Sequence, residues 1–115
     1  MPLNIDKALQ GVVDALRAKG VKANVDPAMV SLPGAWVTAT QGAHVLMCGG
    51  VQLTVEVYLV VADKRVGQAW AELSALLDKA LTAVDPTEPT QLNEAIQLQG
   101  PHPLPCFKIT TTTTA

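Results

Sequence analysis

The chain has few charged residues, few aromatic residues and little cysteine. Asp, Glu, Lys and Arg make up 16% of its 115 residues, and Phe, Trp and Tyr make up 3%. Eight basic residues against ten acidic ones give a net charge of −2, whereas binding in a nucleic-acid groove requires a basic surface. Runs without a polar residue, such as Val57 to Ala62, are far too short to span a bilayer. These shortages argue against nucleic-acid and membrane functions.

The N-terminal residues and the cysteine content bear on where the protein is made. The first ten residues hold no basic segment followed by an apolar core, so we expect no signal peptide. The two cysteines are then expected to be reduced thiols of a protein made in the cytosol. Residues 1–115, of which 49% are hydrophobic, are expected to form one domain with a single core. The low charge fits a protein that buries part of its surface against partners.

The strongest pattern in the chain lies between Val51 and Val84. From Val51 to Ala62 apolar and polar residues alternate, which predicts a half-buried strand roughly 40 Å long. Such a strand is longer than usual and often belongs to a projecting hairpin. From Arg65 to Val84 the apolar residues recur at steps of three and four. That spacing predicts a helix that covers a sheet, with Trp70 in its buried stripe.

The other elements follow from the same periodicities and from turn residues. A helix from Asn4 to Lys19 is expected to end at Gly20 in the left-handed conformation. Gln41-Gly42 predicts a turn, and Gly49-Gly50 predicts a tight hairpin turn. Further strands are expected at 21–25, 35–40, 43–48, 91–99 and 104–114. Together they predict an α+β fold: a mostly antiparallel sheet with a long β-hairpin and two amphipathic helices packed on one face.

Five consecutive threonines, Thr110 to Thr114, lie at the end of the last expected strand. Their β-branched side chains favour extended structure. Two interpretations are open for the segment from Thr110 to Ala115: a flexible tail, or an exposed strand edge that pairs with a neighbouring subunit.

One spacing resembles a metal site. His44 with Cys48, and His102 with Cys106, repeat the pattern His-x3-Cys, and four such ligands would suit tetrahedral zinc. Residues four apart on a strand are separated by roughly 13 Å, however, which is too far for one ion. Two prolines in the second copy disfavour a helix there. We therefore predict structural roles for all four residues, with no metal site and no disulfide.

No other residues are arranged for catalysis or cofactor binding. Neither serine lies in a nucleophile elbow, and the glycines match no phosphate-binding loop or dinucleotide fingerprint. Glu56, on the polar face of the long strand, is expected to be solvated, and Trp36 to be a core or interface residue. We predict no catalytic, cofactor-binding or metal-binding residues and no enzyme activity. A small basic group, expected to be the solvated end of a helix and not a phosphate site, comprises Arg17, Lys19 and Lys22.

The order of helix, strands, long hairpin strand, helix and terminal hairpin resembles the tail terminator proteins of long-tailed (siphovirus-type) bacteriophages. The likeness covers most of the chain as a pattern of elements and not as a diagnostic motif. The residues that carry it are Leu32 to Val37, Leu53 to Val61, Ala71 to Val84 and Leu104 to Thr111.

This resemblance implies a structural virion protein without a cofactor. The family forms a ring, typically of six subunits, that caps the finished tail tube, ends its polymerisation and offers a docking surface to the filled head. The expected partners are copies of the same chain, the tail tube protein and head–tail connector proteins, with genomic DNA passing through the lumen without specific binding. The protein would be made in the host cytoplasm and reside in the tail or neck. Contacts are expected at the hairpin from Gln41 to Gly50 and at the tail from Thr110.

Two alternatives remain open. Another component of the phage neck, such as a head-closure or connector protein, would also form a ring but would bind on the portal side. A small dimeric ligand-binding or regulatory domain would need a pocket with converging polar groups, and the sequence indicates none.

Overall fold

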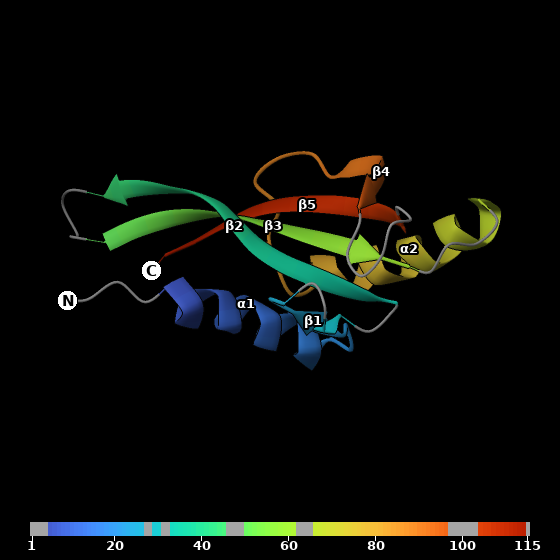
Figure 1. Cartoon of the computed structure of the whole chain (residues 1–115), viewed down its shortest axis with the longest axis horizontal. Helices are drawn as coiled ribbons and strands as arrows, with labels where there is room; N and C mark the ends of the chain where they lie inside the picture. Colours follow the sequence, from blue (N-terminus) through green and yellow to red (C-terminus); the bar gives the residue numbers. More distant parts are fainter. Residues whose placement is uncertain are drawn as a thin grey trace.

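The computed structural model describes residues 5–26, 29–30, 33–45, 50–61, 66–96 and 104–114. The molecule is elongated, 49 × 26 × 23 Å, and its long strands follow its longest axis (Figure 1). Its elements, in chain order, are α1 (Ile5–Ala18), β1 (Ala23–Asn24), β2 (Gly34–Val45), β3 (Gly50–Val60), α2 (Val66–Leu81), β4 (Gln91–Ile96) and β5 (Leu104–Thr114).

The five strands form one sheet in the order β1-β2-β3-β5-β4. All neighbouring strands are antiparallel except β1, which pairs with β2 in parallel over two residues. The α+β fold expected from the sequence, with its mostly antiparallel sheet and long hairpin, is therefore confirmed. The hairpin is not a bare two-stranded projection, because β5 accompanies β3 as far as the pair Gln52–Thr114.

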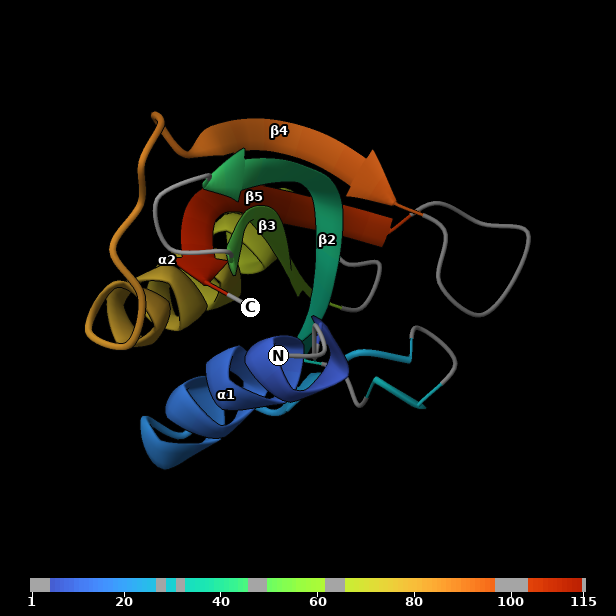
Figure 2. The same ribbon diagram turned by 90° about the vertical axis from the view of Figure 1, so that its left-hand side faces the viewer.

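Both helices pack on one face of the curved sheet, as the sequence predicted (Figure 2). The odd-numbered side chains of β3 lie on that face and are almost fully buried, whereas its polar residues lie on the other face. Apolar burial of this kind is the main favourable contribution to folding. The buried core residues from the helices are Val13, Leu16, Ala69, Leu73, Leu76 and Ala80.

The end of α1 is fixed by Gly20, as expected. Its φ of 88° is left-handed, a conformation that glycine adopts without a Cβ clash. The amide of Gly20 donates to the carbonyl of Arg17, and the amide of Val21 donates to that of Leu16, both at 3.0 Å. These two bonds form a Schellman motif, which satisfies the last carbonyls of the helix. Val21 and Leu16 are both buried, so the same motif directs the chain towards the sheet.

The expected turn at Gln41-Gly42 is wrong, because β2 runs unbroken from Gly34 to Val45. Its register with β3 shifts between Ala39 and Gln41, which leaves Thr40 as the extra residue of a β-bulge. A Cβ on Gly42 would come within 2.9 Å of the Val51 side chain. Glycine here therefore leaves room for the Val51 side chain and does not make a turn.

The prediction that Trp70 is a core residue is also wrong. Its side chain is 40% exposed and meets the ring of Phe107 edge-on, with centroids 5.3 Å apart. Helix α2 ends at Leu81, three residues before the expected end, and Leu81 is 42% exposed. The sheet therefore covers only part of the apolar face of α2, and Trp70 and Leu81 remain partly exposed.

Other expected boundaries differ less. The strand expected at 21–25 is confined to Ala23–Asn24, and the strand expected at 91–99 is described from Gln91 to Ile96. Asn4, Gly49 and residues 97–99 lie outside the described residues.

Candidate interaction site

The residues of the repeated His-x3-Cys pattern do not converge where they can be placed. His44 pairs with Val51 at one end of β3, and Cys106 pairs with Val60 at the other. These two positions are nine residues apart along β3, which corresponds to roughly 30 Å. Cys48 and His102 lie outside the described residues. Within the part of the chain that the structure describes, no three His, Cys, Asp or Glu residues lie close enough to hold a metal ion.

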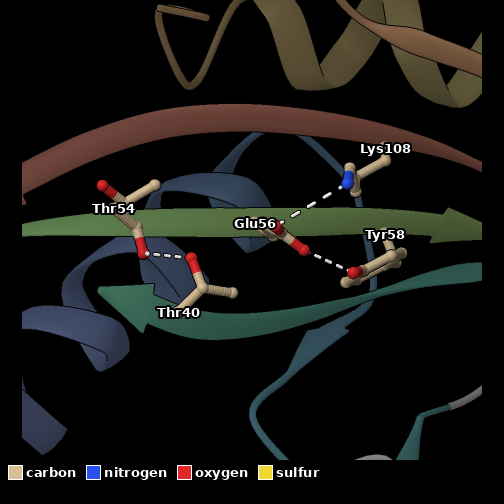
Figure 3. Close-up of polar contacts among 5 residues, drawn as sticks. All are labelled: Thr40, Thr54, Glu56, Tyr58 and Lys108. Atoms are coloured by element: carbon tan, nitrogen blue, oxygen red, sulfur yellow. Dashed lines mark hydrogen bonds and ion pairs between the residues drawn. The ribbon is translucent and has the colours of Figure 1, made fainter.

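The helix-free face of the sheet carries a polar network on β3 and β5 (Figure 3). The Tyr58 hydroxyl donates to one carboxylate oxygen of Glu56, and the other lies 3.7 Å from Nζ of Lys108. Glu56 is only 16% exposed, so it is partly buried and paired and not simply solvated as expected. The network joins the two central strands, which gives it a structural role.

Trp36 belongs to the same face and also has a structural role. Its ring stacks on Tyr58, with centroids 5.3 Å apart and an interplanar angle of 23°. Its indole N–H donates to the carbonyl of Val25 at 3.0 Å. Trp36 therefore fixes the segment after β1 to the sheet, while Arg17 holds β1 itself through a bond from Nε to the Ala23 carbonyl.

The threonine run, Thr110 to Thr114, forms the last part of β5 in the sheet. Each of these threonines pairs with a residue of β3. The loop after α2 adds three hydrogen bonds. The Thr87 amide and hydroxyl donate to the Thr110 carbonyl at 2.8 and 3.3 Å, and the Thr111 hydroxyl donates to the Asp85 carbonyl at 2.6 Å. Thr110 and Thr111 are accordingly buried. Ala115 lies outside the described residues.

Beyond these contacts β5 has an open edge. Strand β4 pairs with β5 only as far as Lys108, and the loop reaches only to Thr111. No described residue pairs with the outer side of Thr112 to Thr114. The expectation of an exposed threonine edge therefore holds for the last part of the run only.

A second open edge lies on β2, on the opposite side of the same end of the sheet (Figure 1). Strand β1 pairs with β2 only at Ala35 and Trp36. From Val37 to Val45 no described strand covers the outer side of β2. The contacts expected at the hairpin from Gln41 to Gly50 overlap the last part of this edge. Its first part, from Val37 to Thr40, was not expected, although the chain has no Asp, Glu, Lys or Arg from Pro27 to Val55.

A groove of about 540 Å³ runs beside the open edge of β5. Its walls are α1, the loop after α2 and the threonines themselves. From α1 the small residues Ala8, Gly11 and Ala15 line the groove together with Lys7 and Val12. Residues that line the groove include Ala8, Gly11, Ala15, Ala83 and Thr112.

Comparison of the chain with protein-family models, with curated proteins and with solved structures found no match. Among the described residues, no helix is long and apolar enough to cross a membrane. Among the described residues, one end of the long sheet has an open strand edge without charged residues on each side.

Proposed function

We propose that this chain is the subunit of a ring that caps the tail tube of a long-tailed bacteriophage, ends the polymerisation of the tube and provides the surface on which the head docks. The observation that carries the proposal is the pair of open strand edges, on β2 and β5, at one end of the sheet. A subunit with two different unpaired edges can bind one copy on each side, which is what a closed ring requires.

Three further features support the proposal. The element order and the segments Leu53 to Val61 and Leu104 to Thr111 resemble the tail terminator proteins. The open edges carry no charged residues, whereas a protein that acts as a monomer usually protects its sheet edges with charges or proline. The 49 Å length of the molecule gives a ring of such subunits two well-separated faces, one for the tube and one for the head.

Tube assembly tests this function directly. The tail tube protein from the same genome is polymerised with and without the purified chain, and the tubes are measured by negative-stain electron microscopy. We expect tubes that stop growing and carry a ring at one end. An unrelated protein of similar size serves as the control. Tubes of unchanged length, together with a compact dimer of the chain, would contradict the proposal and favour the ligand-binding alternative.

The same specimens separate the tail terminator from a head-closure or connector protein. A connector component would also form rings, but these would bind portal complexes and leave tube growth unchanged. Rings at tube ends therefore support the terminator, and free rings beside growing tubes overturn it.

A further inference from the structure

We infer that neighbouring copies join by backbone pairing between the open edge of β5 in one copy and the open edge of β2 in the next. This inference rests on the proposed ring and adds the identity, direction and polarity of its subunit contact.

The backbone groups of β5 that face outwards can be identified from its contacts. In a strand, successive residues direct their N–H and C=O groups to opposite sides. The Thr110 carbonyl accepts from Thr87, which lies away from β3. The Pro105 carbonyl accepts from the amide of Val61 at the end of β3. In β5, odd-numbered residues therefore direct their backbone groups towards β3, and even-numbered residues direct theirs away from it. By this alternation the backbone groups of Thr112 also point away from β3, towards the open edge.

The outward-facing groups of β2 follow from the same alternation. The Ala35 amide donates to the Lys22 carbonyl at 3.0 Å, on the side of β1. Val37 and Ala39 share that alternation, so their N–H and C=O groups also face outwards, beyond the reach of the two-residue β1. After the bulge at Thr40 the pattern shifts by one residue. The outward-facing groups near the hairpin end then belong to Gly42.

The direction of the strands decides what kind of assembly these edges make. Both β2 and β5 are antiparallel to β3, so they run in the same direction. A rotation about an axis along the strands leaves that direction unchanged. Pairing of β5 with the β2 of the next copy is therefore parallel, uses a different edge on each partner and repeats around a ring. A two-fold dimer would instead pair one edge with itself in antiparallel fashion.

A second copy of this chain is the occupant that the edges favour. Neither open edge has a charge or a proline, the features that usually prevent pairing. The two edges lie on opposite sides of the same end of the sheet. Each copy can therefore pair its β5 edge with the β2 edge of one neighbour and its β2 edge with the β5 edge of the other. The groove beside Thr112, which Ala8, Gly11 and Ala15 line together with Lys7 and Val12, leaves room for side chains of the incoming strand.

Two substitutions damage one edge each. Thr112→Pro removes an outward N–H on β5, and Ala39→Pro removes an outward N–H on β2. Because both N–H groups point away from β3, proline at these positions leaves the hydrogen bonds to β3 in place. Thr112→Val and Ala39→Ser keep both N–H groups and are the matched controls. Should either proline variant fail to fold by circular dichroism, Thr112→Lys and Thr40→Lys place a charge on the same exposed edges.

Analytical ultracentrifugation over a wide concentration range then gives the readout. We expect the wild type and the controls to self-associate, and each edge variant alone to associate at least about tenfold more weakly. Mixing the two variants leaves one intact junction, so a one-to-one dimer that grows no further is expected. Variants that assemble like the wild type would overturn the inference. So would a wild type that stays monomeric, or a dimer of the Ala39→Pro variant alone, which would indicate pairing of β5 with itself.

The tube assay keeps this result separate from the proposed function. If the wild type caps tubes and the folded edge variants cap them equally well, the ring is joined by other surfaces and only the inference fails. If the variants show the expected association but no protein caps tubes, the contact stands and the proposed function fails.

Discussion

At the scale of single residues, two glycines illustrate how one substitution can have opposite effects. Gly20 holds a left-handed φ of 88° that ends α1, whereas Gly11 lies within α1, where an added Cβ would have no neighbour within 4 Å. A Cβ at Gly20 would also have no close neighbour. The effect of a substitution on stability is therefore decided at both sites by the backbone conformation and not by steric clashes with other residues.

We predict that Gly20→Ala lowers the free energy of unfolding by about 1 kcal/mol, because alanine is strained in the left-handed region. Gly11→Ala is expected to raise it by about 0.5–1 kcal/mol through better helix propensity. Urea unfolding followed by tryptophan fluorescence measures both. A Gly20→Ala variant as stable as the wild type would show that the Schellman motif contributes little.

The polar network on the helix-free face is the other feature at this scale. Because Glu56 and Lys108 are partly exposed, their ion pair is expected to contribute less than about 1 kcal/mol. Tyr58→Phe removes the hydroxyl that donates to Glu56 and should cost about 1 kcal/mol. A double-mutant cycle with Lys108→Met checks whether the contacts of Glu56 with Tyr58 and with Lys108 are coupled. If Tyr58→Phe left the free energy of unfolding unchanged, the structural role of this network would be contradicted.

At the scale of elements, the sequence predicts which faces are buried better than which strands are neighbours. The alternation in β3 and the stripe of α2 identify the core face, because each period is a local property of the chain. The position of β5 between β3 and β4 depends on contacts between distant segments, which no local pattern contains. The bulge at Thr40 is not predicted for the same reason, since a polar residue followed by glycine is typical of turns and bulges alike.

The candidate site is predicted in part. The threonine edge is anticipated because β-branched residues favour strands, but its first two members are covered by the loop at Asp85 to Thr87. The prediction for Trp70 fails because the helical period shows which face of α2 points towards the sheet. It does not show how much of that face the sheet covers, and Trp70 lies at its exposed margin. The part of the open β2 edge before Gln41 is not predicted, because the lack of charged residues there does not reveal that β1 pairs over two residues only.

The contact of Thr111 with the loop gives a test at the element scale. Thr111→Val removes the hydroxyl that donates to the Asp85 carbonyl and should cost about 1 kcal/mol of unfolding free energy. Thr112→Val, at an exposed neighbouring position, should change stability by less than about 0.5 kcal/mol. Thermal unfolding followed by circular dichroism compares the two. Equal stabilities would mean that the loop does not hold the start of the threonine edge.

At the scale of the whole molecule, the sheet has two different ends. Near the start of β2 it is flanked by β1 and β4, and near the hairpin the described strands are β2, β3 and β5, with open sides. The helices cover one face only, so the opposite face carries the polar residues of β3. Among the described residues, the two ends of the sheet therefore differ in which strands form their edges.

The central claim is that the chain closes into a ring, and the mass of the assembled particle tests it most directly. Native mass spectrometry of the chain, alone and released from capped tubes, is expected to give one discrete species of more than two copies, with six copies as the predicted number. A discrete two-copy species under both conditions would contradict the account, because a two-fold dimer cannot encircle a tube.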